Sequence, residues 1–440
     1  MIIRLQSQRA SQGHVLVCAM VLVGIILIGV AADLSLITYQ YNATIRSAAW
    51  NKTIAVAEAG IEEAYAHLNV NGLDTYSVNG VNKYAANGWA ATTNGYSKRR
   101  DLGNDYYSVT IVTNATPSFI SDGFVRVLPS TKYLKRTIHV TLVNQGMWRG
   151  SMLVKGRITL SGTGVTSDSF DSTNPALSTN GQYDENKRSD HGNIASNSRL
   201  PSAIDIGNGD IYGAINTGPG GTASIGNGSV GDLGWHAGSS SGVKPGHSRS
   251  DMNVAFTDIT IPATITDRGS AGSGTVNGTS YSLIMGSHNY VMSSLSLSGQ
   301  SKMLVNGDAT LYIVDSIDMT GQSTITLATN ASLTIYMAGA SARFNGNGII
   351  NQTGKAVKLQ YLGTPQNRSV SVSGNSAFIG SIYAPSAALS LAGGGNNELD
   401  FVGSAVAETA SLNGHFKFHY DESLGNTNVV KWAIGSWNEL

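Results

Sequence analysis

The chain has little charge, little proline and almost no cysteine. Of its 440 residues, 28 are basic and 28 are acidic, so charged residues make up 13% and the net charge is zero. An average soluble domain carries about 25% charged residues. Sparse, balanced charge excludes the basic surface with which nucleic-acid-binding proteins neutralise phosphates, so we expect no nucleic-acid partner. The single cysteine excludes an internal disulfide and a thiolate zinc cluster.

Glycine and apolar residues are abundant instead. The 52 glycines do not follow the period of collagen, which excludes a triple helix. Hydrophobic residues make up 41% of the chain, enough to build a core. A low-charge chain rich in glycine, serine, threonine and asparagine favours turn-rich β structure, and its length suggests two or three domains.

The N-terminal residues have the pattern of a membrane anchor. Residues 1–13 form a basic leader with Arg4 and Arg9 and no acid, and the run from Val15 to Ala32 has no charge. That run is at the lower limit of length for a helix that spans a bilayer. Basic residues before the span predict that the N-terminus stays inside and that the rest of the chain lies outside.

The helical pattern continues beyond the apolar run. Residues 33–68 contain no proline, and alanine, leucine, isoleucine and glutamate recur at helical spacing. Asn69 and Gly72 supply a stop signal. We therefore predict one helix over residues 14–68, about 80 Å long, with one half in lipid and the other half outside it.

Two stretches of this region resemble a known family. The segment Ser11-Gln12-Gly13 before the apolar helix, and the run AEAGIEEAYAHL at its end, are similar to PilX-type minor pilins among the type IV pilin-like proteins. The resemblance implies cleavage by a prepilin peptidase between Gly13 and His14, and lateral packing with other pilin-like subunits. The fifth residue after Gly13 is Cys18, where most major pilins have a glutamate that neutralises a neighbour's N-terminal amine. An uncompensated amine in a filament core is costly, which favours a minor or tip subunit.

Two other interpretations of the N-terminus stay open. The apolar run is also compatible with an uncleaved signal anchor that keeps Met1 as the first residue. A secretory signal cut after Ala32 fits the small-residue rule, but the helical pattern that continues past Asp33 argues against it. The first residue of the mature protein distinguishes the three cases, since it would be His14, Met1 or Asp33.

Residues 69–148 predict a small antiparallel β head. Alternating strand-like runs occupy residues 106–112, 118–128 and 133–143. A meander of these strands would cover the exposed half of the long helix, which otherwise has no partner. The basic cluster Lys98-Arg99-Arg100 is interpreted as a solvated loop.

Residues 149–440 change in character and predict a β-solenoid of the right-handed type, with a β-sandwich as the alternative. Short β-type runs are separated by glycine turns that recur every 19 to 28 residues, at Gly299, Gly321, Gly346, Gly374, Gly393 and Gly414. Repeats of this length are typical of solenoids, in which strands stack and glycines serve the corners. Long excursions are expected near residues 161–200 and 240–290.

This region also resembles a known type of domain. The segments GSIYAPSAALSLAGGG and DFVGSAVAETASLNGHFKFHYDESLG are similar to an uncharacterised extracytoplasmic β-helical domain that follows PilX-like N-termini in bacterial surface proteins. The resemblance covers roughly residues 150–425 and implies a location and an architecture, with no attached activity.

The most suggestive group of chemical side chains is near the C-terminus. On a strand, His415, Lys417, His419 and Asp421 would share one face. Two histidines and a carboxylate can ligate a metal, but the lysine between them opposes a cation. We therefore interpret this segment as the cap of the last solenoid layer, with Phe416 and its aromatic neighbours closing the open end.

Acidic residues suggest two further possibilities. A loop with several asparagines carries five acids that could bind calcium or simply be solvated: Asp168, Asp171, Asp184, Glu185 and Asp190. The acids of the regular repeats, Asp308, Asp315 and Asp318, have no recurring basic partner of the kind that polysaccharide-cleaving β-helix enzymes use.

Together these observations predict a membrane-anchored structural protein, not an enzyme, that uses no cofactor and no metal. Its expected location is the bacterial inner membrane, with the bulk of the chain extracytoplasmic. Its expected partners are membrane lipid, other pilin-like subunits and surface polysaccharide. The alternative is a carbohydrate-binding or polysaccharide-cleaving β-helix protein on the same anchor.

Overall fold

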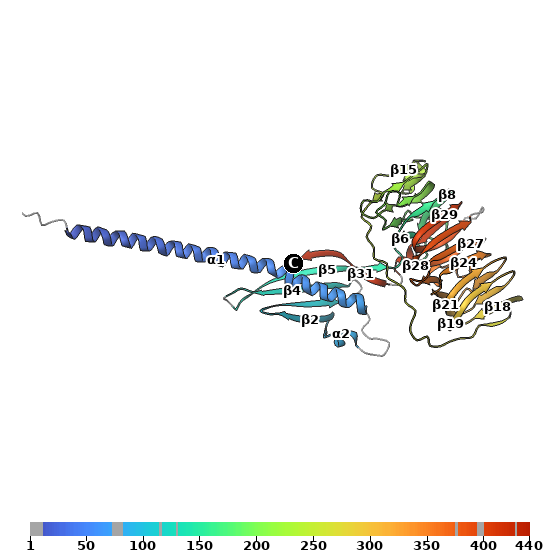
Figure 1. Cartoon of the computed structure of the whole chain (residues 1–440), viewed down its shortest axis with the longest axis horizontal. Helices are drawn as coiled ribbons and strands as arrows, with labels where there is room; N and C mark the ends of the chain where they lie inside the picture. The colour runs from blue at the N-terminus through green and yellow to red at the C-terminus, as the bar shows by residue number, and fades with distance from the viewer. Residues whose placement is uncertain are drawn as a thin grey trace, which may run out of the picture. The chain divides into compact units, whose positions relative to one another are not determined.

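The computed structural model divides the chain into two units, residues 1–144 with 431–440, and residues 145–430. Figure 1 shows the long helix α1 and the strands of both units. The structure describes residues 12–72, 82–113, 117–128, 131–374, 377–393, 400–426 and 429–440.

The first unit begins with α1, Gln12–Asn71, a helix of 60 residues. It is slightly longer at both ends than the predicted 14–68. Its C-terminal end is capped by side-chain amides: Asn69 Nδ2 donates to the Tyr65 carbonyl at 3.2 Å and Asn71 Nδ2 to the His67 carbonyl at 3.1 Å. Gly72 then takes a φ of 72°, a left-handed conformation that ends helices because glycine has no Cβ to clash.

A six-stranded sheet completes this unit. Strands β1 to β5 pair antiparallel in chain order, and β31 adds to β5. In β3 the side chains alternate strictly between buried and half-buried, as expected for a strand with one face on a core. The bounds are α2 Lys83–Ala86, β1 Ala90–Thr92, β2 Gly95–Leu102, β3 Asp105–Val112, β4 Ser118–Arg126, β5 Tyr133–Gly146 and β31 Val429–Glu439.

The C-terminal strand corrects a predicted boundary. The second region was expected to run from residue 149 to residue 440, but residues 431–440 belong to the first unit. Arg136 on β5 pairs with Glu439, and Leu440 N donates to the Thr137 carbonyl at 3.0 Å. The second unit is therefore an insertion between β5 and β31. Sequence periodicity missed this because strand pairing between residues 303 positions apart leaves no local pattern.

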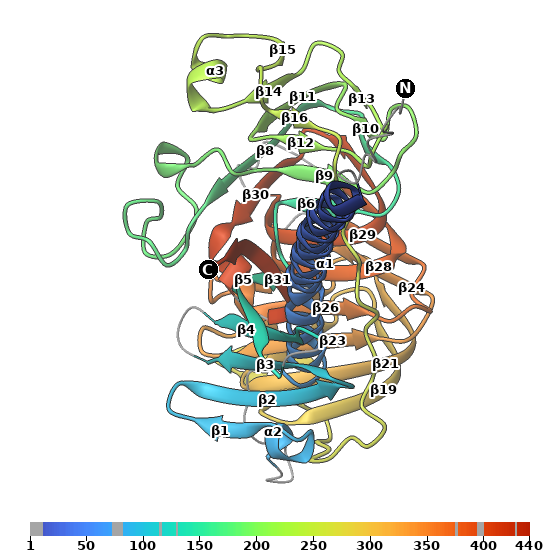
Figure 2. The ribbon, with the colours of Figure 1, turned by 90° about the vertical axis from the view of Figure 1, so that its left-hand side faces the viewer.

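The second unit is a stack of short, mostly parallel strands. One ladder of parallel pairs runs β19–β21–β23–β26–β28–β29–β6–β9–β12–β16, and Figure 2 shows its strands one after another in this order. Their bounds are β19 Asn289–Leu297, β21 Asp308–Met319, β23 Ser332–Met337, β26 Leu359–Gly363, β28 Phe378–Gly393, β29 Phe401–Gly414, β6 Met152–Val154, β9 Ile194–Ser196, β12 Ile215–Asn216 and β16 Ser248–Arg249.

Other parallel ladders lie beside the first. One continues from β19 and β21 through β24, β27, β28, β29, β7, β10 and β13. The remaining parallel strands pair as β18–β20–β22–β25 and β30–β8–β11–β14–β15, and β17 pairs antiparallel with β18. Their bounds are β24 Ser341–Gly346, β27 Ser369–Gly374, β7 Ile158–Leu160, β10 Ile204–Asp205, β13 Ala223–Ser224, β17 Gly272–Val276, β18 Thr279–Met285, β20 Lys302–Val305, β22 Thr324–Leu327, β25 Ile349–Asn351, β30 Lys417–Asp421, β8 Thr163–Phe170, β11 Asn208–Tyr212, β14 Ser229–Gly231 and β15 Gly242–Val243. Short helices are η1 Glu185–Lys187, α3 Leu233–Ala237, η2 Ala356–Lys358 and η3 Glu422–Asn426.

The order of strands in the stack differs from their order in the chain. Ala405 of β29 pairs with Met152 of β6, so the chain enters the stack in its middle. Strands from β6 to β16 continue the stack on one side of that point, and those from β17 to β30 build the other side. Residues 250–271, between β16 and β17, connect the two far ends, and we call this segment the strap.

The strandless segments are narrower than the predicted excursions near residues 161–200 and 240–290. Residues 171–193 loop out between β8 and β9 and the strap covers residues 250–271, whereas strands occupy other parts of both ranges. The strap itself packs on the outside of the stack: Met252 is buried, and Val254, Phe256 and Ile259 lie against outward side chains such as Tyr383. Burial of this apolar stripe explains why a segment without strands follows a defined path.

The interior of the stack is apolar and in register. Phe378, Phe401 and Phe418 stack along it, with ring centroids 5.0 Å and 4.4 Å apart. At two turns of the stack, Gly321 and Gly346 both have positive φ, and a Cβ on Gly346 would lie 2.9 Å from the Gly321 carbonyl oxygen. Both the backbone conformation and the close stacking favour glycine at these turns.

Candidate functional site

The N-terminal half of α1 presents an uninterrupted apolar surface. Side chains from Val15 to Ile37 are mostly exposed, with 68% of Val15 and 72% of Ile28 accessible. α1 is long and apolar enough, by length and composition, to cross a membrane. Contiguous apolar surface of this extent is unfavourable in water, so it marks a place where lipid or another protein covers the helix.

The C-terminal half of α1 packs on the antiparallel sheet. Small residues of the helix, Ala57 and Ala64 among them, are fully buried beside Val109, Phe119 and Val140 of the sheet. Two glycines set this close approach: a Cβ on Gly123 of β4 would lie 2.3 Å from the Thr53 carbonyl oxygen and 2.6 Å from Ala57 N. On the helix side, a Cβ on Gly60 would meet Ser121 Oγ at 2.3 Å. The glycine of the AEAGIEEA run is thus a packing residue.

The same run carries a half-buried carboxylate. Glu63 binds Lys98 Nζ at 2.9 Å, Arg100 Nε at 3.2 Å and the Tyr107 hydroxyl. Burial raises the pKa of Glu63, but the hydrogen bonds from Arg100, Tyr107 and Lys98 outweigh it and lower the pKa to about 2. The interpretation of Lys98-Arg99-Arg100 as a solvated loop was wrong, because these residues lie on β2 and two of them pair with the helix.

Replacing Glu63 by glutamine is expected to destabilise the first unit by about 3 kcal/mol at neutral pH. Because the folded pKa lies below the ordinary value of 4.5, this stabilisation is fully present above pH 4.5 and disappears as the pH falls toward 2. Hydrogen exchange of the β2 and β3 amides in the detergent-solubilised full chain measures it. The neighbouring exposed Glu62→Gln is the control, and equal effects of the two variants at neutral pH would contradict the assignment.

The predicted processing site lies at the start of α1. Gly13 and His14 are within the helix, but their side chains lie outside the described residues, so cleavage there stays a prediction. Cys18 is an exposed free cysteine one turn further on. Val15 to Ala32, the predicted anchor, all lie in the exposed apolar part of α1.

The structure separates the predicted C-terminal cluster. His415 is exposed and precedes β30, whereas His419 and Asp421 are buried on that strand. Asp421 accepts from the backbone N–H groups of Ser172 and Ser423, both at 3.1 Å. Among the residues that the structure describes, no group of three or more His, Cys, Asp or Glu side chains is placed to hold a metal ion.

The sequence predicted that this segment closes an end of the stack, and that prediction was wrong. β30 lies between β29 and β8, because Phe418 pairs with Phe401 on one side and with Ser167 on the other. The aromatic rings therefore lie within the stack. The prediction failed because chain order suggested that the last repeat is the last layer, and the pairing of β30 with β8 is visible only in the tertiary structure.

His419 instead belongs to a buried group that the sequence did not predict. Its Nδ1 lies 2.5 Å from Asp168 Oδ1, and the Tyr183 hydroxyl donates to Asp168 Oδ2 at 2.6 Å. The Tyr183 ring stacks on His419 at 3.7 Å, and burial beside Asp168 raises the tyrosine pKa. Tyr183 comes from the loop 171–193, so this group ties the loop to the stack. Asp168 had been singled out as a calcium candidate and His419 as a metal candidate with His415 and Asp421, but the sequence did not bring the two together or add Tyr183.

The other acids of that loop have separate local partners. Asp171 accepts from Thr173 N at 2.8 Å, Asp184 caps η1, and Glu185 pairs with Arg188 at 3.3 Å. Asp190 accepts from Leu233 N at 3.2 Å. In the repeats, Asp308 binds the Ser332 hydroxyl at 2.5 Å, while Asp315 and Asp318 lie on β21. The carboxylates of the loop thus cap turns or accept from nearby backbone, and that of Asp308 joins neighbouring strands.

Comparisons with known proteins add two similarities. The model of a family described as a domain of unknown function (DUF7305) matches residues 249–427, from the end of β16 through η3. Among solved structures, the chain is similar to the competence-associated pilin ComZ from Thermus thermophilus, with 10% identity, a TM-score of 0.22, and coverage of 88% of this chain and 96% of that chain. The search of curated proteins finds no match. The function is therefore argued from the geometry of this chain.

Proposed function

We propose that the protein is a membrane-anchored, pilin-like structural subunit, and that it is a minor or tip component of a type IV pilus or related secretion filament. The observation that carries this proposal is the division of α1 at about Ala49. From Val15 to Ile37 the helix exposes an apolar surface, and from Ala49 onward it packs on its own antiparallel sheet. A helix of this kind leaves its first half for lipid or for the same helix of other subunits.

The proposal includes the location and the processing that the PilX-type resemblance implies. The apolar half of α1 holds the protein in the bacterial inner membrane, and the bulk of the chain is extracytoplasmic. A prepilin peptidase cuts between Gly13 and His14, and the released helices pack laterally. N-terminal sequencing of protein from membranes and from sheared surface fibres tests this: a start at His14 in both supports it, and a start at Met1 or Asp33 contradicts it.

The second unit, in this proposal, is a β-solenoid of the right-handed type that the anchor displays for contact with a surface. Parallel ladders, apolar in-register stacking and corner glycines support the solenoid architecture. The insertion between β5 and β31 supports the display role, because both ends of the stack's chain return to the anchored unit. The proposed role is structural contact, including adhesion, without catalysis.

The sole cysteine provides a test of lateral packing. Oxidation of membranes that contain the protein is expected to link two copies through Cys18, because parallel helices inserted to the same depth bring equal positions together. Dimers on a non-reducing gel measure the reaction. Cys18→Ser removes it, and single cysteines placed in turn at Ala19, Met20 and Val21 map the contacting face of the helix.

A second cysteine position supplies the control. Thr92→Cys in the Cys18→Ser background places an exposed thiol on β1, far along the chain from the apolar helix. Little dimer is expected there. If none of the four consecutive helix positions gives more dimer than position 92, the helices do not pack laterally and the subunit proposal fails, even where the protein remains in the membrane.

A further inference from the structure

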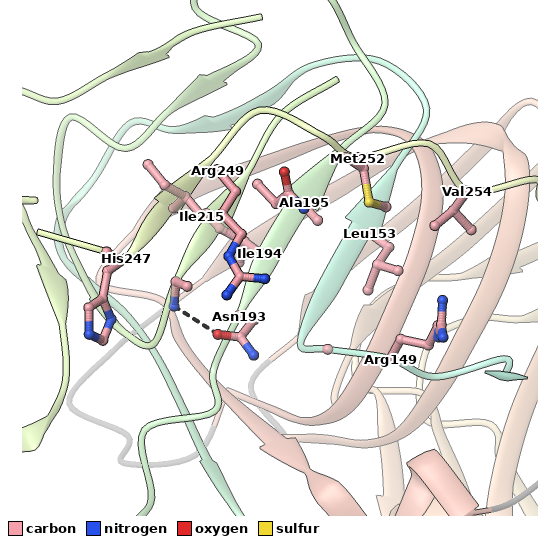
Figure 3. Close-up of a pocket in the computed structure, with 14 residues that line it drawn as sticks. Arg149, Leu153, Asn193, Ile194, Ala195, Ile215, His247, Arg249, Met252 and Val254 are labelled. Atoms are coloured by element: carbon pink, nitrogen blue, oxygen red, sulfur yellow. Dashed lines mark hydrogen bonds between the residues drawn. The ribbon is translucent and has the colours of Figure 1, made fainter. Parts of the chain in front are cut away.

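The second unit has an open pocket of about 530 Å³ on the outer side of β6, β9, β12 and β16. Figure 3 shows that its residues come from these strands and from the beginning of the strap. A pocket of this volume is in the range that holds small organic ligands, and it is far larger than an inorganic anion needs. None of its residues belongs to the clusters described above for His419 or Glu63.

The floor of the pocket is a cross-strand row. Leu153 pairs with Ala195, Ala195 with Asn216, and Asn216 with Arg249, so these side chains lie on one face of four neighbouring parallel strands. Strands in a sheet are about 4.8 Å apart, so the row extends for about 14 Å. The floor is thus an elongated surface that changes from apolar at Leu153 to cationic at Arg249.

The strap forms a fixed wall. Met252 N donates to the Thr217 carbonyl at 2.9 Å, and Val254 exchanges two hydrogen bonds with the Asn197 amide, at 3.1 Å and 2.6 Å. Asn193 Oδ1 accepts a hydrogen bond from Ala214 N at 2.8 Å (Figure 3). This bond fixes the orientation of the Asn193 side chain and does not use its NH₂ group. The wall and this amide are therefore positioned before any ligand arrives, which lowers the entropy cost of binding.

The charged side chains that line the pocket are basic, and one acid adjoins its floor: Asn216 Nδ2 donates to Asp251 Oδ1 at 2.9 Å. Arg149 and Arg249 both line it, and its described lining contains no aspartate or glutamate. Among the described residues, neither guanidinium forms an ion pair or a side-chain hydrogen bond. Both guanidinium side chains belong to exposed residues, and partial desolvation by neighbouring atoms lowers the pKa of Arg149. His247 at the other end donates from Nδ1 to the Gly213 carbonyl, 2.8 Å away.

We propose that this pocket binds an acidic oligosaccharide through the carboxylates of its uronic acid units. Two guanidinium groups recognise carboxylates that are separated along a chain, since each can form a paired hydrogen-bonded contact. The partly exposed apolar side chains of Ala195 and Val254 contact the C–H face of a sugar ring between them, and the Asn193 amide donates to a hydroxyl. This proposal rests on the surface-contact role proposed above and names its ligand class, but it is independent of filament assembly.

Binding of tetragalacturonate to the detergent-solubilised full chain, measured by titration calorimetry, tests the proposal. Arg149→Gln and Arg249→Gln are each expected to weaken binding about tenfold, and the double variant about a hundredfold, since each removes a charged hydrogen-bond donor. Raising sodium chloride from about 0.05 M to about 0.5 M should weaken binding as well. Arg249→Lys keeps the charge but loses the planar guanidinium, so its affinity should fall between those of the wild type and Arg249→Gln.

Arg343→Gln is the matched control, because Arg343 is an exposed arginine on β24 outside the pocket. It should leave binding unchanged, and neutral maltotetraose should not bind. The proposal is overturned if maltotetraose binds as well as tetragalacturonate, if Arg343→Gln has the same effect as the pocket variants, or if inorganic phosphate at the same concentration displaces the sugar. If the sugar does not bind but Cys18 cross-links, only the proposed ligand is wrong. If the sugar binds but Cys18 does not cross-link, only the proposed filament role is wrong.

Discussion

Arginine at both Leu22 and Ile26 is expected to remove the protein from the membrane fraction. Both side chains lie in the apolar half of α1, with 61% and 54% of their surface exposed. Each arginine near the centre of a membrane helix costs about 3 kcal/mol on insertion scales, so two cost about 6 kcal/mol. A change of that size shifts an insertion equilibrium by about four orders of magnitude. Fractionation of cells that produce the double variant measures the loss.

The control places the same two charges outside the apolar helix. Leu102→Arg with Leu128→Arg substitutes two exposed leucines of the first unit, on or next to the sheet. This variant should remain in the membrane fraction at the wild-type level. If the α1 double variant also remained there and resisted extraction with carbonate, the apolar half of α1 would not be the anchor.

Replacing Gly123 by alanine is expected to separate α1 from its sheet. The new methyl group would lie 2.3 Å from the Thr53 carbonyl oxygen and 2.6 Å from Ala57 N, and both are backbone atoms of the helix. No side-chain rotation relieves such contacts, so the helix as a whole must move away from β4 and open the core. We expect a destabilisation of about 3 kcal/mol or more, at the upper end for an overpacked core. Hydrogen exchange of the β3 and β4 amides in the full chain measures it.

Alanine substitutions at two other glycines provide a scale for the destabilisation caused by Gly123→Ala. Gly60→Ala meets the side chains of Ser121 and Tyr107, which can shift, so its cost should be smaller. Gly29→Ala lies in the exposed part of α1 with nothing within 4 Å and should leave the sheet unchanged. Hydrogen exchange of the amides in the strands of the second unit serves as an internal reference. An effect of Gly123→Ala no larger than that of Gly29→Ala would show that the helix does not depend on this close approach.

Local patterns in the sequence predicted the parts of the fold that local physics determines. The apolar run from Val15 to Ala32 and the proline-free continuation predicted one long helix, and the structure confirms a long apolar helix followed by mostly β structure. Alternation predicted strands near residues 106–112 and 133–143, where β3 and β5 occur. These signals survive because helix and strand periods depend on neighbouring residues.

Contacts between residues that are distant in the sequence could not be predicted from such local patterns. The Glu63 cluster joins a helix to β2, and the group of His419, Asp168 and Tyr183 joins two ends of the second unit's chain. Lys98 and Arg100 were assigned to a loop, and Asp168 and His419 were grouped with the acids and histidines next to them in the sequence. The pocket with Arg149 and Arg249 was missed for the same reason, since its residues become adjacent only through the pairing of β6, β9, β12 and β16.

The sequence by itself determined that a long helix begins with an uncharged apolar run and that a glycine-rich, low-charge body of short strands follows, because helix and strand periods depend on neighbouring residues. Only the tertiary structure decided that the chain enters the stack at β6, in its middle, and that β31 returns to the first unit. The physical reason is that parallel strands offer equivalent backbone hydrogen bonds to any neighbour in register. Which neighbour is chosen therefore depends on side-chain packing across the whole stack, such as Phe418 between Phe401 and Ser167.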